Sequence, residues 1–175
     1  MTLLTETSAE DLTDKLAYAG LVSLAYELLK GMVIAPIKSF YAHTIFSGGP
    51  FVSYEHDVIS LYNKSEFQAC LFYLRDFMQV ISSEDIACIQ NLRDHRNELL
   101  HNLPKHLPSL RVEDYAELFR ATDSTILKLS NHLAYMEKGA NPAYKDLDWN
   151  NAKGDEYLLY EEVLEKMQRL RERLR

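Results

Sequence analysis

The sequence has few residues that break regular structure. It contains 6 Gly and 5 Pro in 175 residues, with no low-complexity tract and no fixed-period repeat. Disordered and fibrous chains are rich in such features, so both classes are excluded. The remaining composition, 47% hydrophobic and 26% charged, is that of an ordinary soluble globular protein. This length suffices for one core, and we predict a single domain over residues 1–175.

Cysteine is scarce as well. The two cysteines, Cys70 and Cys88, belong to no CxxC or Cys/His metal-binding spacing, and we interpret both as reduced packing residues. The six histidines form no i, i+4 pair on any predicted helix. The GxGxxG, GxxxxGKS/T, HExxH and GxSxG patterns are missing. The sequence therefore predicts neither a metal site nor a cofactor.

The chain lacks an excess of positive charge, because its formal net charge is −7. This balance excludes broad, non-specific binding to nucleic acid or to an anionic membrane, and a nucleic-acid substrate would need a local basic cleft. The most apolar segment, residues 16–37, is interrupted by Glu27, Lys30, Gly31 and Pro36, too often for a membrane span. The first residues do not resemble a signal peptide. We therefore expect a cytoplasmic protein without membrane contact.

No segment shows the alternation of a β-strand, whereas apolar residues recur at helical spacing along most of the chain. The spacing predicts helices over residues 8–45, with a bend at Pro36, and over 65–81, 84–102, 112–138 and 155–174. Ser65, the cap Ser82-Ser83-Glu84-Asp85 and Asp155 mark the starts of three of these helices, and Pro104 is expected to stop the helix over 84–102. Residues 51–64 are expected to form a loop with one helical turn near 56–62, and residues 139–154 a second loop. The predicted fold class is all-α, a bundle of four or five helices.

One stretch in mid-chain, Arg93-Asp94-His95-Arg96-Asn97-Glu98-Leu99-Leu100-His101-Asn102, concentrates polar chemistry. On a helix, the leucines at 92, 99, 100 and 103 form one apolar stripe, and Arg96 points into the middle of it. A guanidinium keeps its charge, so it needs a buried carboxylate or an anion at an interface. The candidate carboxylates are Asp76 and Glu27, and Glu27 is the predicted structural partner of Arg96 across the core.

The segment Arg96-Asn97-Glu98-Leu99-Leu100-His101 resembles the signature of the HEPN superfamily, the α-helical "higher eukaryotes and prokaryotes nucleotide-binding" domains. An arginine is followed directly by a polar residue and, after four intervening positions, by a histidine. The resemblance covers residues 10–138 and implies a helical bundle of HEPN type. The predicted helix over residues 155–174 would be an addition to that bundle.

Many HEPN proteins are metal-independent endoribonucleases that act as homodimers, with the two motifs facing each other across a cleft. The resemblance implies that His101 acts as general base or acid at the ribose 2′-hydroxyl or the leaving 5′-oxygen. Arg96 would bind the phosphate of the RNA substrate, and Asn97 would orient the histidine or the phosphate. The products would carry a 2′,3′-cyclic phosphate. Such an enzyme would be a toxin or phage-defence effector, with a nucleotidyltransferase as its possible antitoxin.

A dimer would also account for the charge of Arg96 within the apolar stripe if the leucines pack at the subunit interface. The Arg96 guanidinium groups of the two chains would then lie close together and attract an anion. Arg93, Lys105 and His106 flank the motif and are candidate contacts to the RNA backbone, although lone basic residues on a helix are usually just solvated. Two alternatives stay open. In the first, His101 is an ordinary histidine at the C-terminal end of a helix, where it interacts with the helix dipole. The protein can also be a non-catalytic HEPN-like dimer that binds a nucleotide, RNA or a protein partner in a regulatory role.

Overall fold

The structure is a computed structural model that describes residues 9–45, 48–107, 110 and 116–173. Within these ranges the chain forms helices and no strand, which confirms the predicted all-α class. The helices are α1 (Ala9–His43), α2 (Tyr54–Asp57), α3 (Glu66–Asp76), α4 (Ser83–His101), α5 (Leu103–His106), α6 (Ala116–Lys138) and α7 (Asp155–Arg173). Short 3₁₀ turns at Ile59–Leu61, Pro142–Tyr144 and Trp149–Asn151 lie in the connections.

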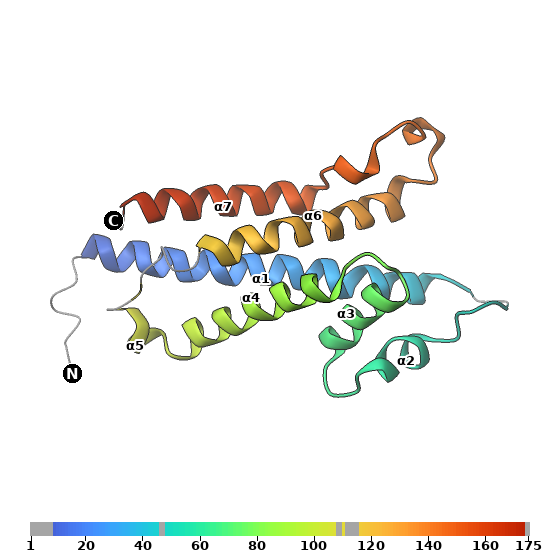
Figure 1. The fold of residues 1–175 in the computed structure, drawn as a ribbon, viewed down its shortest axis with the longest axis horizontal. Coiled ribbons are helices and arrows are strands. Elements are labelled where there is room, and N and C mark those ends of the chain that lie inside the picture. The colour runs from blue at the N-terminus through green and yellow to red at the C-terminus, as the bar shows by residue number, and fades with distance from the viewer. Residues whose placement is uncertain (1–8, 46–47, 108–109, 111–115, 174–175) are drawn as a thin grey trace.

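Helix α1 forms the axis of the bundle, and α3, α4, α6 and α7 pack along it (Figure 1). Its side chains Val22, Leu29 and Val33 are fully buried. The helix continues through Pro36, where the sequence predicts a bend. Proline has no N–H, so the carbonyl four residues earlier loses its helical hydrogen bond, yet the bonds on either side carry the helix to His43.

In the described part of the chain, α1 is the one helix with the length and apolar character of a membrane span, over Glu10–His43. The residues expected to interrupt such a span do not break the helix. Two of them, Glu27 and Gly31, lie on its exposed side. Its other side is covered by neighbouring helices, as in the core helix of a globular protein.

Helix α3 begins at the predicted Ser65 cap, whose hydroxyl accepts from the Gln68 N–H. It ends at Asp76, whereas the apolar period predicts a helix to residue 81. Gln79 has a φ of +56°, and the Val80 N–H donates to the carbonyl of Leu74. The left-handed residue reverses the chain, so the later apolar side chains pack on the core from a turn. The helical turn expected near 56–62 is present as the 3₁₀ turn Ile59–Leu61, and α2 adds a turn just before it.

Helix α4 begins with the capping box predicted at Ser82-Ser83-Glu84-Asp85. The Ser82 hydroxyl accepts from the Asp85 N–H at 3.2 Å, and the Asp85 carboxylate accepts from the Ser82 N–H at 2.8 Å. Buried Asp85 also accepts from Thr125 and Lys128 of α6, each at 2.7 Å. This carboxylate ties the start of α4 to α6 and thereby holds the helix that carries the central motif.

After His101 the chain forms the short helix α5, where the sequence predicts that Pro104 stops the helix altogether. Proline is tolerated in the first turn of a helix, so Pro104 separates two helices without excluding the second. The predicted start of the next helix near Val112 lies outside the described residues, and α6 is described from Ala116.

Helix α7 shares the core of the other helices. Fully buried Tyr160 places its hydroxyl 2.9 Å from the Thr122 hydroxyl of α6. Arg173, at the end of α7, pairs at 2.9 Å with the buried Asp14 near the start of α1. The last helix therefore covers α1 and α6, and its predicted final residue, Leu174, lies outside the described part.

Candidate functional site

Arg96 lies near the C-terminal end of α4, at the edge of the bundle, with 26% of its side chain exposed. Its Nη1 donates to Asn97 Oδ1 at 3.1 Å, and its guanidinium carbon lies 5.5 Å from the centre of the Tyr26 ring. Burial raises the pKa of Tyr26, although nearby Arg93 acts in the opposite direction. The neutral ring and the amide together fix the plane of the guanidinium.

The predicted pairing of Arg96 with Glu27 is present, since Nη2 lies 3.5 Å from Oε1. The Glu27 side chain is 48% exposed and lies 3.7 Å from Lys30 as well, so the pair lies at the surface and does not cross the core. Asp76, the other candidate carboxylate, instead forms two short hydrogen bonds with Arg75. A long, exposed ion pair is weak, and an incoming phosphate can displace it.

Part of the predicted leucine stripe packs inside a single chain: Leu92 and Leu99 are buried there, 0% and 2% exposed, whereas Leu100 and Leu103 are half-buried. The polar side chain on this buried face is His95, which is 8% exposed, whereas Arg96 lies beside the face. The spacing Leu92, His95, Leu99 is i, i+3, i+7, a helical signal that the motif-centred interpretation missed.

His101 lies in the last turn of α4 and is exposed. Five positions along a helix separate it from Arg96 by about 140° around the axis and about 7.5 Å along it. The two side chains of one chain therefore leave α4 on different sides. Asn97, predicted to orient the histidine or the phosphate, contacts Arg96.

The flanking candidates are scattered. Arg93 binds its neighbour Asp94 through Nε and Nη2, at 3.2 and 3.1 Å. Lys105 is exposed on α5. His106 ends α5, and the position of its side chain lies outside what the structure describes. Arg93 lies one turn before Arg96 on α4, and the Lys105 N–H donates to the carbonyl of Asn102, directly after the motif.

The described residues contain no group of three or more His, Cys, Asp and Glu side chains arranged to hold a metal ion. Cys70 is buried and Cys88 half-buried, and both are free thiols. Three kinds of chemistry are available here. The guanidinium of Arg96 can bind an anion, the amide of Asn97 can form hydrogen bonds, and His101, in the last turn of the same helix, can exchange a proton.

No family model, curated protein or solved structure matches this chain. Its own residues and their geometry therefore carry the functional argument.

Proposed function

We propose that the protein is a homodimeric, metal-independent endoribonuclease of HEPN type that acts in the cytoplasm as a toxin or phage-defence effector. The observation that supports this best is the setting of Arg96. Its guanidinium is oriented by Asn97 and the Tyr26 ring, is held only loosely by Glu27, and lies near the end of the helix that carries His101.

The RNA supplies its own nucleophile in this reaction. The ribose 2′-oxygen attacks the adjacent phosphorus, the bond from phosphorus to the 5′-oxygen breaks, and the products are a 2′,3′-cyclic phosphate and a 5′-hydroxyl. His101 takes the proton of the 2′-hydroxyl or donates one to the leaving 5′-oxygen. Arg96 binds the phosphate oxygens as negative charge grows on them. Asn97 holds Arg96 in the orientation for a two-point contact.

A second copy would complete this site, because Arg96 and His101 of one chain leave α4 on different sides. The exposed face of α1 next to Arg96 is suited to such a contact. Leu16 and Leu24 are 45% and 42% exposed there, and no atom lies within 4 Å of the place where a Cβ on Gly20 would be. A two-fold dimer on this face would cover Arg96 and shield it from water.

Incubation of the purified protein with mixed RNAs in excess EDTA tests the activity. We expect cleavage with 2′,3′-cyclic phosphate ends, and a loss of at least about 100-fold in His101→Ala and Arg96→Ala. His56→Ala, at an exposed histidine on α2, serves as the matched control and should cleave at the wild-type rate. Absence of cleavage of any RNA, together with harmless overexpression, would overturn the proposal.

A second function, a non-catalytic HEPN-like dimer that binds a nucleotide, RNA or a protein partner, is favoured by the carboxylate of Glu27 beside Arg96 and by the net charge of −7. RNA cleavage separates the two functions, and Glu27→Gln tests the anion site at Arg96 that they would share. Freeing Arg96 should tighten oligonucleotide binding in either case, whereas RNA cleavage is expected only from the enzyme. Because the pair is exposed, we expect the free energy of unfolding to change by less than about 0.5 kcal/mol.

A further inference from the structure

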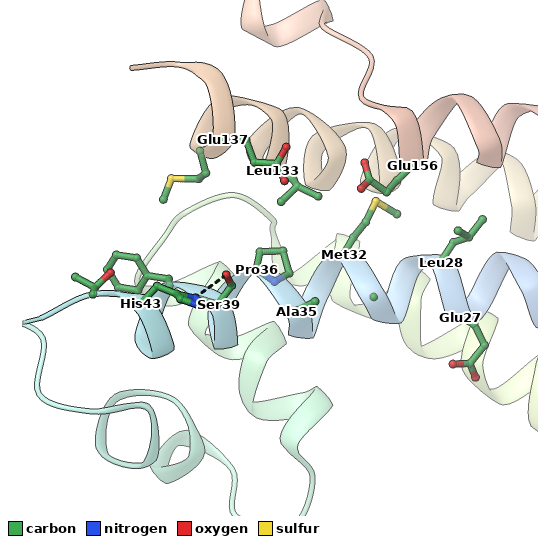
Figure 2. A pocket seen from close by; sticks show the side chains of 14 residues that line it. Glu27, Leu28, Met32, Ala35, Pro36, Ser39, His43, Leu133, Glu137 and Glu156 are labelled. Atoms are coloured by element: carbon green, nitrogen blue, oxygen red, sulfur yellow. Dashed lines mark hydrogen bonds between the residues drawn. The ribbon is translucent and has the colours of Figure 1, made fainter. Parts of the chain in front are cut away.

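Two adjoining hollows lie between α1 and α6. The inner cavity has a volume of about 210 Å³, and the outer groove, which extends to the start of α7, about 680 Å³. They share five lining side chains: Met32, Pro36, Phe40, Leu133 and Met136. The hollows therefore form one cleft with a narrower inner end and a more open mouth, whose lining side chains Figure 2 shows.

The inner cavity is lined almost entirely by apolar groups, including the rings of Phe40, Phe51 and Tyr73. Phe40 and Phe51 meet edge to face with centroids 5.2 Å apart. His132 contributes the one side-chain nitrogen, and burial lowers the pKa of this residue, which favours its neutral form. Apolar cavities of about 150 Å³ stay dry and bind benzene-sized molecules, so this cavity has room for an aromatic ring or a short alkyl chain.

The mouth of the cleft carries negative charge. Glu137 and Glu156 line the outer groove, and Figure 2 shows Glu156 extending from α7 toward Met32. Glu27 also lines the groove, but its carboxylate points to the other side of α1. His43 also lines the groove, and its Nδ1 lies 2.9 Å from the carbonyl oxygen of Ser39 on the same helix. Neither lysine nor arginine is among the described residues that line either hollow.

We propose that this cleft binds a small organic cation with an apolar body. The body, an aromatic ring or short alkyl chain, occupies the inner cavity against Phe40 and Phe51. The ammonium group lies in the outer groove, where Glu156 and Glu137 attract it. The ring of Phe40, which lines both hollows, also favours a cation over an anion.

The size of the inner cavity excludes a helical peptide, because a helix with its side chains is about 10 Å across. A ligand pocket with an apolar interior and a few charged groups at its mouth is the common design for small-molecule recognition. The site lies apart from His101 and needs no RNA, so binding to it can be tested independently of the ribonuclease proposal.

Calorimetric titration with three probes of similar shape tests the charge preference. We expect phenethylammonium to saturate one site and 2-phenylethanol to bind more weakly. We expect 3-phenylpropanoate to bind at least tenfold more weakly than the cation. Glu156→Gln should weaken phenethylammonium several-fold and leave the alcohol unchanged. Equal affinity for the cation and the anion would overturn the proposal.

A variant that blocks entry to the cleft tests where the cation binds. Met136 is 48% exposed at the junction of the two hollows, so Met136→Trp can block entry without disturbing the core. We expect it to abolish binding of phenethylammonium at an unchanged melting temperature. Tyr135→Trp, 51% exposed at the neighbouring position, is the control and should bind as wild type. Undiminished binding in Met136→Trp, or no saturable binding by the wild type, would contradict the proposal.

Discussion

Asp85 combines a helix cap with contacts between two helices. Its buried carboxylate closes the cap of α4 and accepts hydrogen bonds from Thr125 and Lys128. Burial alone would raise the pKa of Asp85, but the hydrogen bonds from Lys128, from the Ser82 N–H and from Thr125 lower it below the usual value. A lowered pKa in the folded state stabilises the fold above the unfolded pKa of about 4. That contribution is lost as the pH falls through the lower, folded pKa.

We therefore expect Asp85→Asn to lower the free energy of unfolding by about 2 kcal/mol at pH 7, because three donors lose a charged acceptor. The difference from wild type should shrink as the pH falls below 4. Urea unfolding at pH 7, 4 and 3 measures both effects. Asp76→Asn is the control: its pair with Arg75 is exposed, so a much smaller change is expected. An equal effect at both positions would contradict the role assigned to Asp85.

Among the elements, α3 shows how one residue ends a helix. Gln79 adopts a φ of +56° on an exposed turn, a conformation that costs a non-glycine residue about 1 kcal/mol. Glycine adopts this conformation without strain. Its backbone is also freer in the unfolded chain, which offsets part of the gain in stability.

We expect Gln79→Gly to stabilise the protein by about 0.5 kcal/mol and Gln79→Val to destabilise it by at least 1 kcal/mol, because a β-branched side chain tolerates positive φ least. Thermal unfolding of the two variants provides the measurement. If both substitutions shift the melting temperature in the same direction, the turn does not depend on the left-handed conformation.

At the scale of the whole molecule, the exposed face of α1 is the surface that we propose for the contact between two chains. We expect Leu24→Lys to convert the dimer to a folded monomer and to reduce RNA cleavage in parallel, because an ammonium group would be buried in an apolar contact. Light scattering coupled to size exclusion measures the mass. Leu158→Lys, at a leucine 46% exposed on α7, is the matched control and should leave the dimer intact. A monomeric wild type would contradict this arrangement.

The helical periods and caps made much of this fold predictable. Ser65 and Ser82 cap helix starts as the sequence predicts, because capping depends on residues within one turn, whereas Asp155, the predicted cap of the last helix, is the first residue of α7. The end of α3 was predicted too late, since apolar side chains in a turn can keep the spacing of a helix. For the candidate site, the sequence predicted the contact between Arg96 and Glu27 but placed it across the core.

The sequence by itself determined the all-α class, the capped start of α4 and the concentration of polar groups at its end. Each of these depends on residues close together in the chain. Only the tertiary structure decided that His95, and not Arg96, faces the core, and that Tyr26 lies against the guanidinium of Arg96. Periodicity tells which residues share one face of a helix. It does not tell which helix covers that face, because helix packing joins residues such as Tyr26 and Arg96 that are far apart along the chain.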